Sequence, residues 1–253
     1  MNDYEKTILS FLLAAAMLAA AGFSASAQMS FQAGVTMPYQ RELQMEPLAI
    51  YDRYGIGAYF GFDYDIHIIK GFSISPGLFY NFTSAKSSGY EDRLYAEETQ
   101  RDHLINIPVH FKYEFNIRPN RFAIYIYAGP MFSLGAASRT KGFLSGSGLF
   151  MNVYYDNYSG VLKDLQFPGL SGIIGPEEKQ ELMDAIQAEL DAYGPTQRRF
   201  DLQIDWGVGF RFKKHWELKT GYSFGLIDRF NGVFGQNYNL MMNQYYIGFG
   251  YRF

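Results

Sequence analysis

The sequence has no cysteine among its 253 residues. This absence excludes disulfides, thiol catalysis, cysteine-ligated zinc and a lipid anchor on an N-terminal cysteine. Net charge is also small, since 22 Lys and Arg oppose 25 Asp and Glu, and it indicates no nucleic-acid partner. Beyond residue 23, no segment offers the roughly 18 consecutive apolar residues of a membrane-spanning helix. Any crossing of a membrane by the later chain must therefore use a β-barrel.

The single long apolar run, 8–23, lies near the N-terminus and is short for a spanning helix, which needs about 20 residues. Lys6 precedes the run, although two acids stand beside it, and the small-residue triplet 25–27 (Ala-Ser-Ala) follows it. These features predict that 1–27 is a secretory signal peptide, cleaved near Ala27. The remaining residues, 28–253, are expected to form one barrel domain.

Aromatic residues are abundant, at 18% of the chain, with 21 Tyr and 23 Phe but only 2 Trp. Aromatic side chains suit the pleated surface of a sheet. Apolar residues also recur at every second position, which places them on one face of a strand, whereas a helix would scatter them. Eight strands are predicted on this basis: 29–37, 55–66, 71–83, 105–115, 122–134, 201–212, 216–228 and 244–253.

The connections between these strands alternate in length. The long ones are 38–54, 84–102, 136–198 and 229–241, and the short ones are 67–70, 116–120 and 213–215. An antiparallel barrel with long loops on one side and tight turns on the other gives this order. The fold class predicted is therefore all-β: an eight-stranded antiparallel transmembrane β-barrel with long extracellular loops. The segment 136–198 is the longest insertion.

The polar faces of the strands carry charges of both signs. On the expected register these charges are Asp63, Asp65, Lys112, Glu114, Asp201, Asp205, Arg211, Glu217, Lys219 and Arg252. Mixed charges among small residues fit the packed interior of a narrow barrel. A soluble barrel would instead enclose its apolar face, but the aromatic side chains are too many for an eight-stranded lumen. We expect a structural network of paired lumen charges, because an unpaired buried ion is costly; an ion or proton pathway is the alternative.

Several stretches resemble a known family. "LINIPVHFKYEF" (104–115) has Ile-Pro within a strand that ends in Lys-Tyr, and "FAIYIYAGPMFSLG" (122–135) has Tyr followed by Ala-Gly-Pro. The run 201–228 has a Gly-x-Gly strand and then a Tyr-Ser-x-Gly-Leu strand, and "YYIGFGYRF" ends the chain. With these motifs the chain resembles the PorT-like outer-membrane β-barrel proteins of Gram-negative bacteria. The resemblance implies the fold and the outer membrane, and no single activity.

The four histidines raise an enzymatic alternative, an outer-membrane lipid-modifying enzyme with a Ser/His site. His67 and His215 are expected at periplasmic turns, His103 at an outer strand end and His110 in the lumen. A nucleophile and its base must lie within hydrogen-bonding reach, and His110 would meet a serine only across the barrel. No two histidines have the spacing of metal ligands. We therefore expect no catalytic residues, no metal site and no cofactor.

The segment 136–198 contains a predicted helix, 176–192. Pro176 suits the first helical position, and two acids follow it in the first turn, where the helix dipole favours them. Leu182, Ile186 and Leu190 form an apolar stripe. A helix this short is marginal alone in water, so the stripe should pack on the loop's own strands, the barrel rim or a partner. A loop of this length indicates a functional role or disorder.

The chain ends on an aromatic strand. Tyr251 and Phe253 lie on its apolar face, with Arg252 facing the lumen. They resemble the C-terminal signal that barrel-assembly machinery reads, so deletion of Phe253 is expected to impair assembly. We predict an integral protein of the cell outer membrane, in contact with outer-membrane lipid. Its expected role is non-enzymatic, through a surface protein or ligand at the 136–198 loop. The first alternative is a narrow channel for small solutes, and the second is the lipid-modifying enzyme.

Overall fold

The computed structural model describes residues 28–42, 53–91, 94–118, 121–146, 149–169, 174–191, 196–229 and 240–253. The predicted signal peptide lies outside the described residues. Among those described, no helix combines the length and apolar character needed to cross a membrane.

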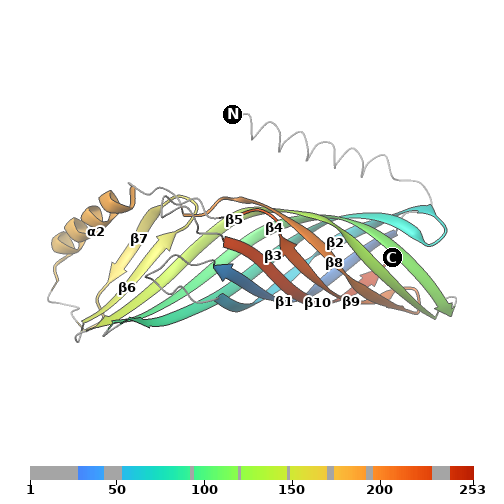
Figure 1. Ribbon diagram of the computed structural model, residues 1–253, viewed down its shortest axis with the longest axis horizontal. Coiled ribbons are helices and arrows are strands. Elements are labelled where there is room, and N and C mark those ends of the chain that lie inside the picture. The colour runs from blue at the N-terminus through green and yellow to red at the C-terminus, as the bar shows by residue number, and fades with distance from the viewer. Residues whose placement is uncertain are drawn as a thin grey trace, which may run out of the picture.

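Eight strands close into a ring (Figure 1). They are β1 (Gln28–Glu42), β2 (Arg53–Ile69), β3 (Phe72–Glu91), β4 (Leu94–Arg118), β5 (Phe122–Gly146), β8 (Phe200–Phe212), β9 (Trp216–Gly225) and β10 (Leu240–Arg252). The order is β4–β3–β2–β1–β10–β9–β8–β5, and pairing of β4 with β5 completes the ring. Every neighbouring pair is antiparallel. The prediction of an eight-stranded antiparallel barrel is confirmed.

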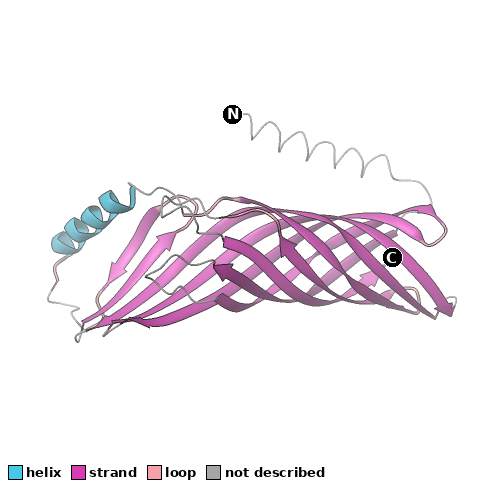
Figure 2. Ribbon diagram, in the orientation of Figure 1, coloured by secondary structure: helices cyan, strands magenta, loops and turns pink. Residues whose placement is uncertain are grey.

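Part of the sheet continues past the closed ring. β8 pairs with β5 as far as Phe200 opposite Leu134, and β6 (Leu149–Asp156) then pairs with β5 from Arg139 onward. β7 (Val161–Gln166) pairs with β6, and the helix α2 (Pro176–Asp191) packs along β7. Figures 1 and 2 show β6, β7 and α2 beyond the ends of β1 and β10. We call the part of β3–β7 beyond the ring, with α2, the outer sheet.

The largest differences from the predicted strand limits lie in the outer sheet; in the ring, β1 runs on to Glu42, β9 ends at Gly225 rather than at 228, and β10 begins at Leu240. β3 runs to Glu91 and β4 begins at Leu94, so most of 84–102 is strand rather than loop. The segment 136–198 contains the end of β5, the hairpin β6–β7 and the predicted helix. Apolar alternation fails to mark these strands because their buried face is itself polar: Gln100, Asp102 and Ser138 are each at most 2% exposed. The helix itself ends at Asp191, one residue before its predicted end.

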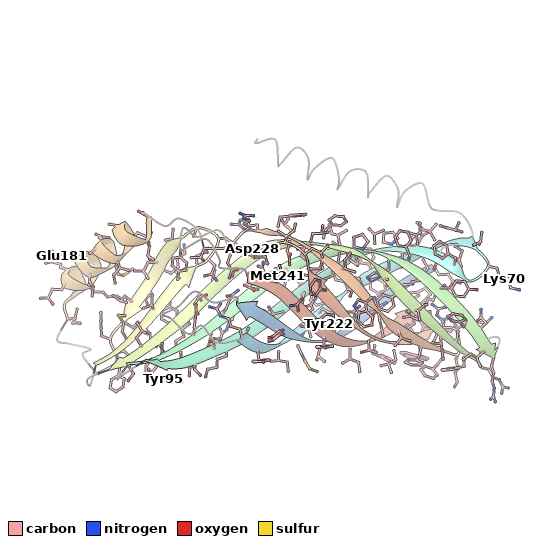
Figure 3. All side chains as sticks on the ribbon, viewed as in Figure 1. Lys70, Tyr95, Glu181, Tyr222, Asp228 and Met241 are labelled. Atoms are coloured by element: carbon pink, nitrogen blue, oxygen red, sulfur yellow. The ribbon has the colours of Figure 1, made fainter. Side chains whose placement is uncertain are left out.

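The two faces of the barrel wall have opposite character. Outside, Phe60, Trp206 and Phe249 are 60%, 55% and 53% exposed, whereas inside Asp63 and Glu217 are completely buried. An apolar exterior around a polar interior is the arrangement of a barrel in lipid and the inverse of a soluble barrel. Figure 3 shows Lys70 at the end with the short turns, and Tyr95 and Glu181 at the opposite end.

Aromatic side chains fill the middle of the lumen. They are Tyr59, Phe79, Tyr125, Tyr127 and Tyr246. Glycines on nearby strands of the wall make room for the rings: a Cβ on Gly209 would overlap the ring of Tyr125, its cross-strand partner, and one on Gly248 would overlap the hydroxyl of Tyr59. The inward-facing glycines therefore let large rings occupy an eight-stranded lumen.

Candidate functional site

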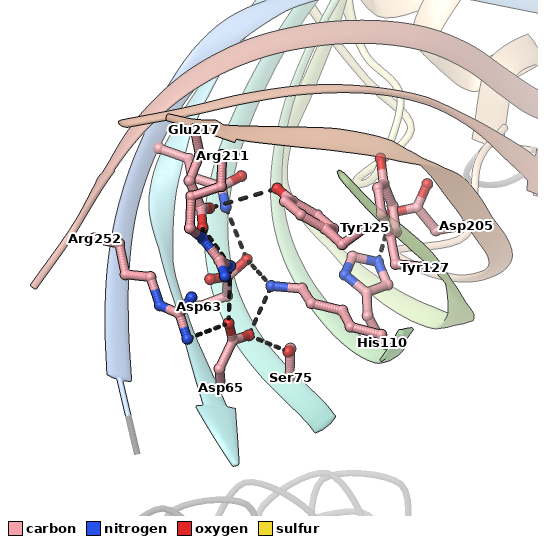
Figure 4. A network of polar contacts seen from close by, with 12 residues as sticks. Asp63, Asp65, Ser75, His110, Tyr125, Tyr127, Asp205, Arg211, Glu217 and Arg252 are labelled. Atoms are coloured by element: carbon pink, nitrogen blue, oxygen red, sulfur yellow. Dashed lines mark hydrogen bonds and ion pairs between the residues drawn. The ribbon is translucent and has the colours of Figure 1, made fainter. Parts of the chain in front are cut away.

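Lys112 on β4 reaches past β3 to two carboxylates on β2. Its Nζ lies 2.8 Å from Oδ1 of Asp65 and 3.3 Å from Oδ2 of Asp63. Ser75 on β3 donates its hydroxyl to the same Asp65. Asp63 and Asp65 share the inner face because they stand two positions apart on one strand. Figure 4 shows this ionic cluster inside the barrel wall.

Arginines join this cluster to the far wall of the barrel. β2 stands opposite β8 in the ring, and β4 stands opposite β10. Arg211 on β8 lies 3.6 Å from a carboxylate oxygen of Asp65 on β2, and Arg252 on β10 lies 3.8 Å from one of Glu114 on β4. Arg211 also pairs with Glu114, and with Glu217 at 2.7 Å. Ion pairs between opposite strands mean that side chains occupy the full width of the lumen here.

A second polar group lies deeper in the lumen around Asp205. The imidazole Nε2 of His110 is 2.7 Å from one oxygen of this carboxylate, and Ser223 donates to the other at 3.0 Å. Tyr246 donates to Asp205 at 2.9 Å and shares a 2.6 Å hydrogen bond with Tyr127. These side chains come from β4, β8, β9, β10 and β5. Their hydrogen bonds link these five strands to one another inside the lumen.

Lys219 lies beside this second group without forming an ion pair among the described residues. Its Nζ is 4.4 Å from the centroid of the Tyr127 ring, which attracts the ammonium through a cation–π interaction. The side chain borders a cavity of about 40 Å³ that His110 and Asp205 also line. Such a volume has room for water beside polar groups and excludes anything as large as a lipid.

All ten charges predicted to face the lumen do so. Nine are at most 5% exposed, and the carboxylate side chain of Glu114 is 22% exposed. The structure brings seven of them into one network: Asp63, Asp65, Lys112, Glu114, Arg211, Glu217 and Arg252. Asp205 belongs to the group around His110, and Asp201 accepts a hydrogen bond from Gln203 at 2.7 Å. The predicted set is thus divided among separate levels of the lumen.

A further polar cluster, which the sequence did not reveal, lies at the outer end of the lumen. Arg229 is 1% exposed, donates to the Tyr158 hydroxyl at 3.0 Å and lies 3.8 Å from Asp102. Gln100 donates to the same Asp102 at 2.8 Å, and the guanidinium of Arg53 donates to the side-chain oxygen of Gln100. These residues fall in or beside segments predicted to be loops, so no alternation marked them as inward-facing.

The helix α2 is held on β7 mainly by polar contacts. Gln187 accepts a hydrogen bond from the backbone N–H of Leu162 at 2.7 Å and donates to the carbonyl of Gly160 at 3.0 Å. Lys179 lies 2.7 Å from Asp164, and its hydrogen bond holds the pKa of that carboxyl below its usual range. Of the predicted stripe, Ile186 and Leu190 are half-buried, whereas Leu182 is 39% exposed. The helix thereby covers polar backbone groups of β7, which ends the described sheet.

The last residues are tied to the first strand. The backbone N–H of Phe253 donates to the carbonyl of Met29 at 3.0 Å. The Phe253 ring meets Phe31 edge-on with centroids 5.8 Å apart and Tyr251 with centroids 5.1 Å apart. Phe253 is 65% exposed on the outer surface. The C-terminal aromatics thus close the ring against β1 at the short-turn end.

The profile of a family described as "Outer membrane protein beta-barrel domain" matches residues 19–231. The chain belongs to this family. It is an integral outer-membrane protein, as the apolar exterior of its ring requires. In such barrels the short turns face the periplasm and the long connections face the outside. The outer sheet of this outer-membrane barrel therefore stands on the extracellular side, and the ionic cluster of Lys112 lies toward the periplasm.

Solved outer-membrane barrels are similar to this chain at low identity. Neisserial surface protein A (NspA) is 13% identical, with a TM-score of 0.40, over 90% of this chain and 99% of its own. Ail of Yersinia pestis is 11% identical, with a TM-score of 0.35, over 90% and 99%. The outer membrane enzyme PagL is 11% identical, with a TM-score of 0.36, over 86% and 97%. No curated protein matches the chain.

Proposed function

We propose that this outer-membrane barrel is a non-enzymatic surface protein whose outer sheet binds a partner. The observation that carries the proposal is the contrast between the two halves of the molecule. The lumen is crossed by ion pairs between opposite strands, whereas β5, β6, β7 and α2 build a large structure outside the ring. The ring therefore serves as a membrane anchor for the outer sheet. The Ile-Pro, Ala-Gly-Pro and Gly-x-Gly motifs further support membership of the PorT-like group within the family.

The interior argues against the channel alternative. A conducting path needs a continuous polar space, but Arg211 and Arg252 meet carboxylates of the opposite wall. The ring at mid-height is filled by the packed tyrosines around Tyr125. Seven of the inward-facing charges pair with one another in a single network, which offsets their desolvation.

The same interior argues against the lipid-modifying enzyme. His110 and Asp205 form a histidine–carboxylate pair, the usual orienting element of a hydrolytic site. Yet His110 is 1% exposed, and the adjoining cavity of about 40 Å³ admits no acyl chain. Ser75, which faces His110 across the β3–β4 pair, donates to Asp65 instead. The pair is placed to brace the barrel wall.

The outer sheet has features suited to a partner. Four of its elements each expose a large apolar side chain to solvent by 37–43%. They are Leu144 on β5, Phe150 on β6, Val161 on β7 and Leu182 on α2. On one face of the sheet, Phe143 contacts both Phe150 and Tyr95, so partly exposed aromatic rings adjoin across three strands. A contiguous apolar patch outside the membrane favours a protein or ligand surface. Lipid covers the aromatic belt of the ring, and we expect the barrel-assembly machinery to bind at Tyr251 and Phe253.

Replacement of 136–198 by an Asn-Gly turn tests the proposal. Gly135 and Arg199 are already joined by a 2.7 Å hydrogen bond from the N–H of Gly135 to the carbonyl of Arg199. A two-residue turn therefore connects β5 to β8 as a hairpin. The shortened chain should reach the outer membrane at normal levels but recover no surface partner from intact cells.

The matched control is the full chain with Leu182→Ala, which alters the exposed face of α2 and leaves the outer sheet folded. We expect it to recover less partner than the unaltered chain and more than the shortened one. Equal recovery of the same partner by the full and shortened chains would refute the proposal.

A further inference from the structure

The periplasmic mouth of the barrel contains a second cavity, separate from the outer sheet. Its volume is about 330 Å³, and its lining includes Arg118, Arg121, Arg211, Lys214 and Arg252. Glu114 is the one carboxylate side chain among the lining residues. Five elements supply the five cations: the end of β4, the β4–β5 turn, β8, the β8–β9 turn and β10. Positive charge is thus gathered here from distant parts of the chain.

The cations divide into a buried pair and an exposed set. Arg211 and Arg252 lie at the floor and share Glu114 and Asp65. Arg118, Arg121 and Lys214 are exposed at the rim, where they form no ion pair with any described residue. In addition, the Nε of Arg252 is buried without a hydrogen-bond acceptor. The rim therefore carries cations without carboxylate partners among the described residues, whereas at the floor it is the Nε of Arg252 that lacks an acceptor.

The charged residues of the β8–β9 turn have an unfavourable backbone conformation. Lys213 and Lys214 have φ of +49° and +67°, the left-handed region, where glycine or asparagine is easier to accommodate. Asn-Gly would build the same two-residue turn with less strain. Lysine at both positions instead places an ammonium on the rim of the cavity. The turn thus favours positive charge over ease of folding.

We propose that this basic mouth binds a phosphate group. Planar guanidinium groups match the oxygen geometry of phosphate, and several of them converge here with one ammonium. The mouth also lies at the membrane surface. Trp216 and Tyr251 contact each other on the barrel wall next to the mouth, and such aromatic residues are typical of the membrane–water interface. Phosphate at this level comes either from the headgroup of an anionic phospholipid or from free phosphate in the periplasm, and both present the same oxygens.

Two binding measurements on the purified full chain distinguish these sources. Equilibrium dialysis in neutral detergent at low ionic strength measures inorganic phosphate. Retention of lipid from vesicles containing both phosphatidylglycerol and phosphatidylcholine measures headgroup binding. Saturable phosphate binding assigns the free anion, and selective retention of phosphatidylglycerol assigns the headgroup; either result supports the site. Retention of neither ligand overturns it.

Substitutions then locate the site. Lys213→Asn combined with Lys214→Gly removes two cations, of which only Lys214 lines the cavity. It should weaken binding about fivefold, as expected for one cation at a membrane surface, while its easier turn leaves the barrel at least as stable. Arg118→Gln with Arg121→Gln should weaken binding about fivefold for each cation removed. Lys86→Gln, a matched loss of charge at the outer end beside Glu97, should change nothing. Binding that is equally strong in all three variants would overturn the proposal.

Discussion

Lys112→Met is expected to destabilise the folded barrel by about 3–5 kcal/mol, the usual effect of removing one partner from a buried ion pair. Methionine retains most of the lysine side-chain volume but leaves the carboxylates of Asp63 and Asp65 without their ammonium. Both carboxylates are at most 2% exposed, so water does not replace it. The change is measured as the urea midpoint for unfolding from lipid vesicles, and as the temperature at which gel mobility shifts.

Two comparisons separate lost charge from lost packing. Lys86→Met removes an exposed ammonium 2.8 Å from Glu97 in the outer sheet and should leave the midpoint unchanged. Asp65 keeps Arg211 and Arg252, so Asp63 is the carboxylate that Lys112→Met leaves without an ion-pair partner among the described residues. Adding Asp63→Asn removes that charge and should restore part of the stability. An unchanged midpoint in Lys112→Met would show that the network does not hold the barrel together.

Gly209→Ala should destabilise the barrel by about 1–3 kcal/mol, because a methyl group on this inner wall is an overpacking change. The new Cβ would overlap the ring of Tyr125. That ring has little freedom to move, since Lys112 and Arg211 lie over it at 5.5 and 5.4 Å from its centroid. The measurement is again the urea midpoint in vesicles.

Gly142→Ala is the matched control for this substitution. It lies in the outer sheet, where the added Cβ would meet only the Cβ of Val153 at 3.9 Å, an ordinary contact. We expect its midpoint to equal that of the unaltered chain. If the two alanine variants unfold at the same urea concentration, tight packing of Tyr125 against Gly209 is not the reason for the inward-facing glycine.

The ring could be predicted from sequence because lipid and lumen impose opposite demands on successive side chains. One short stretch of β2 shows this pattern, with Asp63 and Asp65 buried in the lumen and Phe60 and Phe62 exposed on the outer surface. All ten predicted charges lie on the inner face. The helix was equally readable, since Pro176 and the acids after it mark a helix start regardless of tertiary surroundings.

Contacts between non-neighbouring strands could not be predicted, because they depend on the stagger of the strands around the ring. The pairing of His110 with Asp205, and of Arg211 with Asp65, follows from that stagger rather than from spacing along the chain. The outer sheet escaped prediction for a different reason. Segments such as 84–91 carry polar side chains on both faces, so apolar residues show no period of two there. Arg229 gave no signal that it would be buried.

A lumen that is closed by its own side chains leaves function to the outer sheet. Planar-bilayer recording of the purified full chain tests this closure most directly, with a large porin in the same membrane as a positive control. Because ion pairs join opposite walls and tyrosines pack the middle of the ring, we predict no conductance steps at voltages where the porin conducts. Reproducible single-channel steps from the full chain would contradict the account.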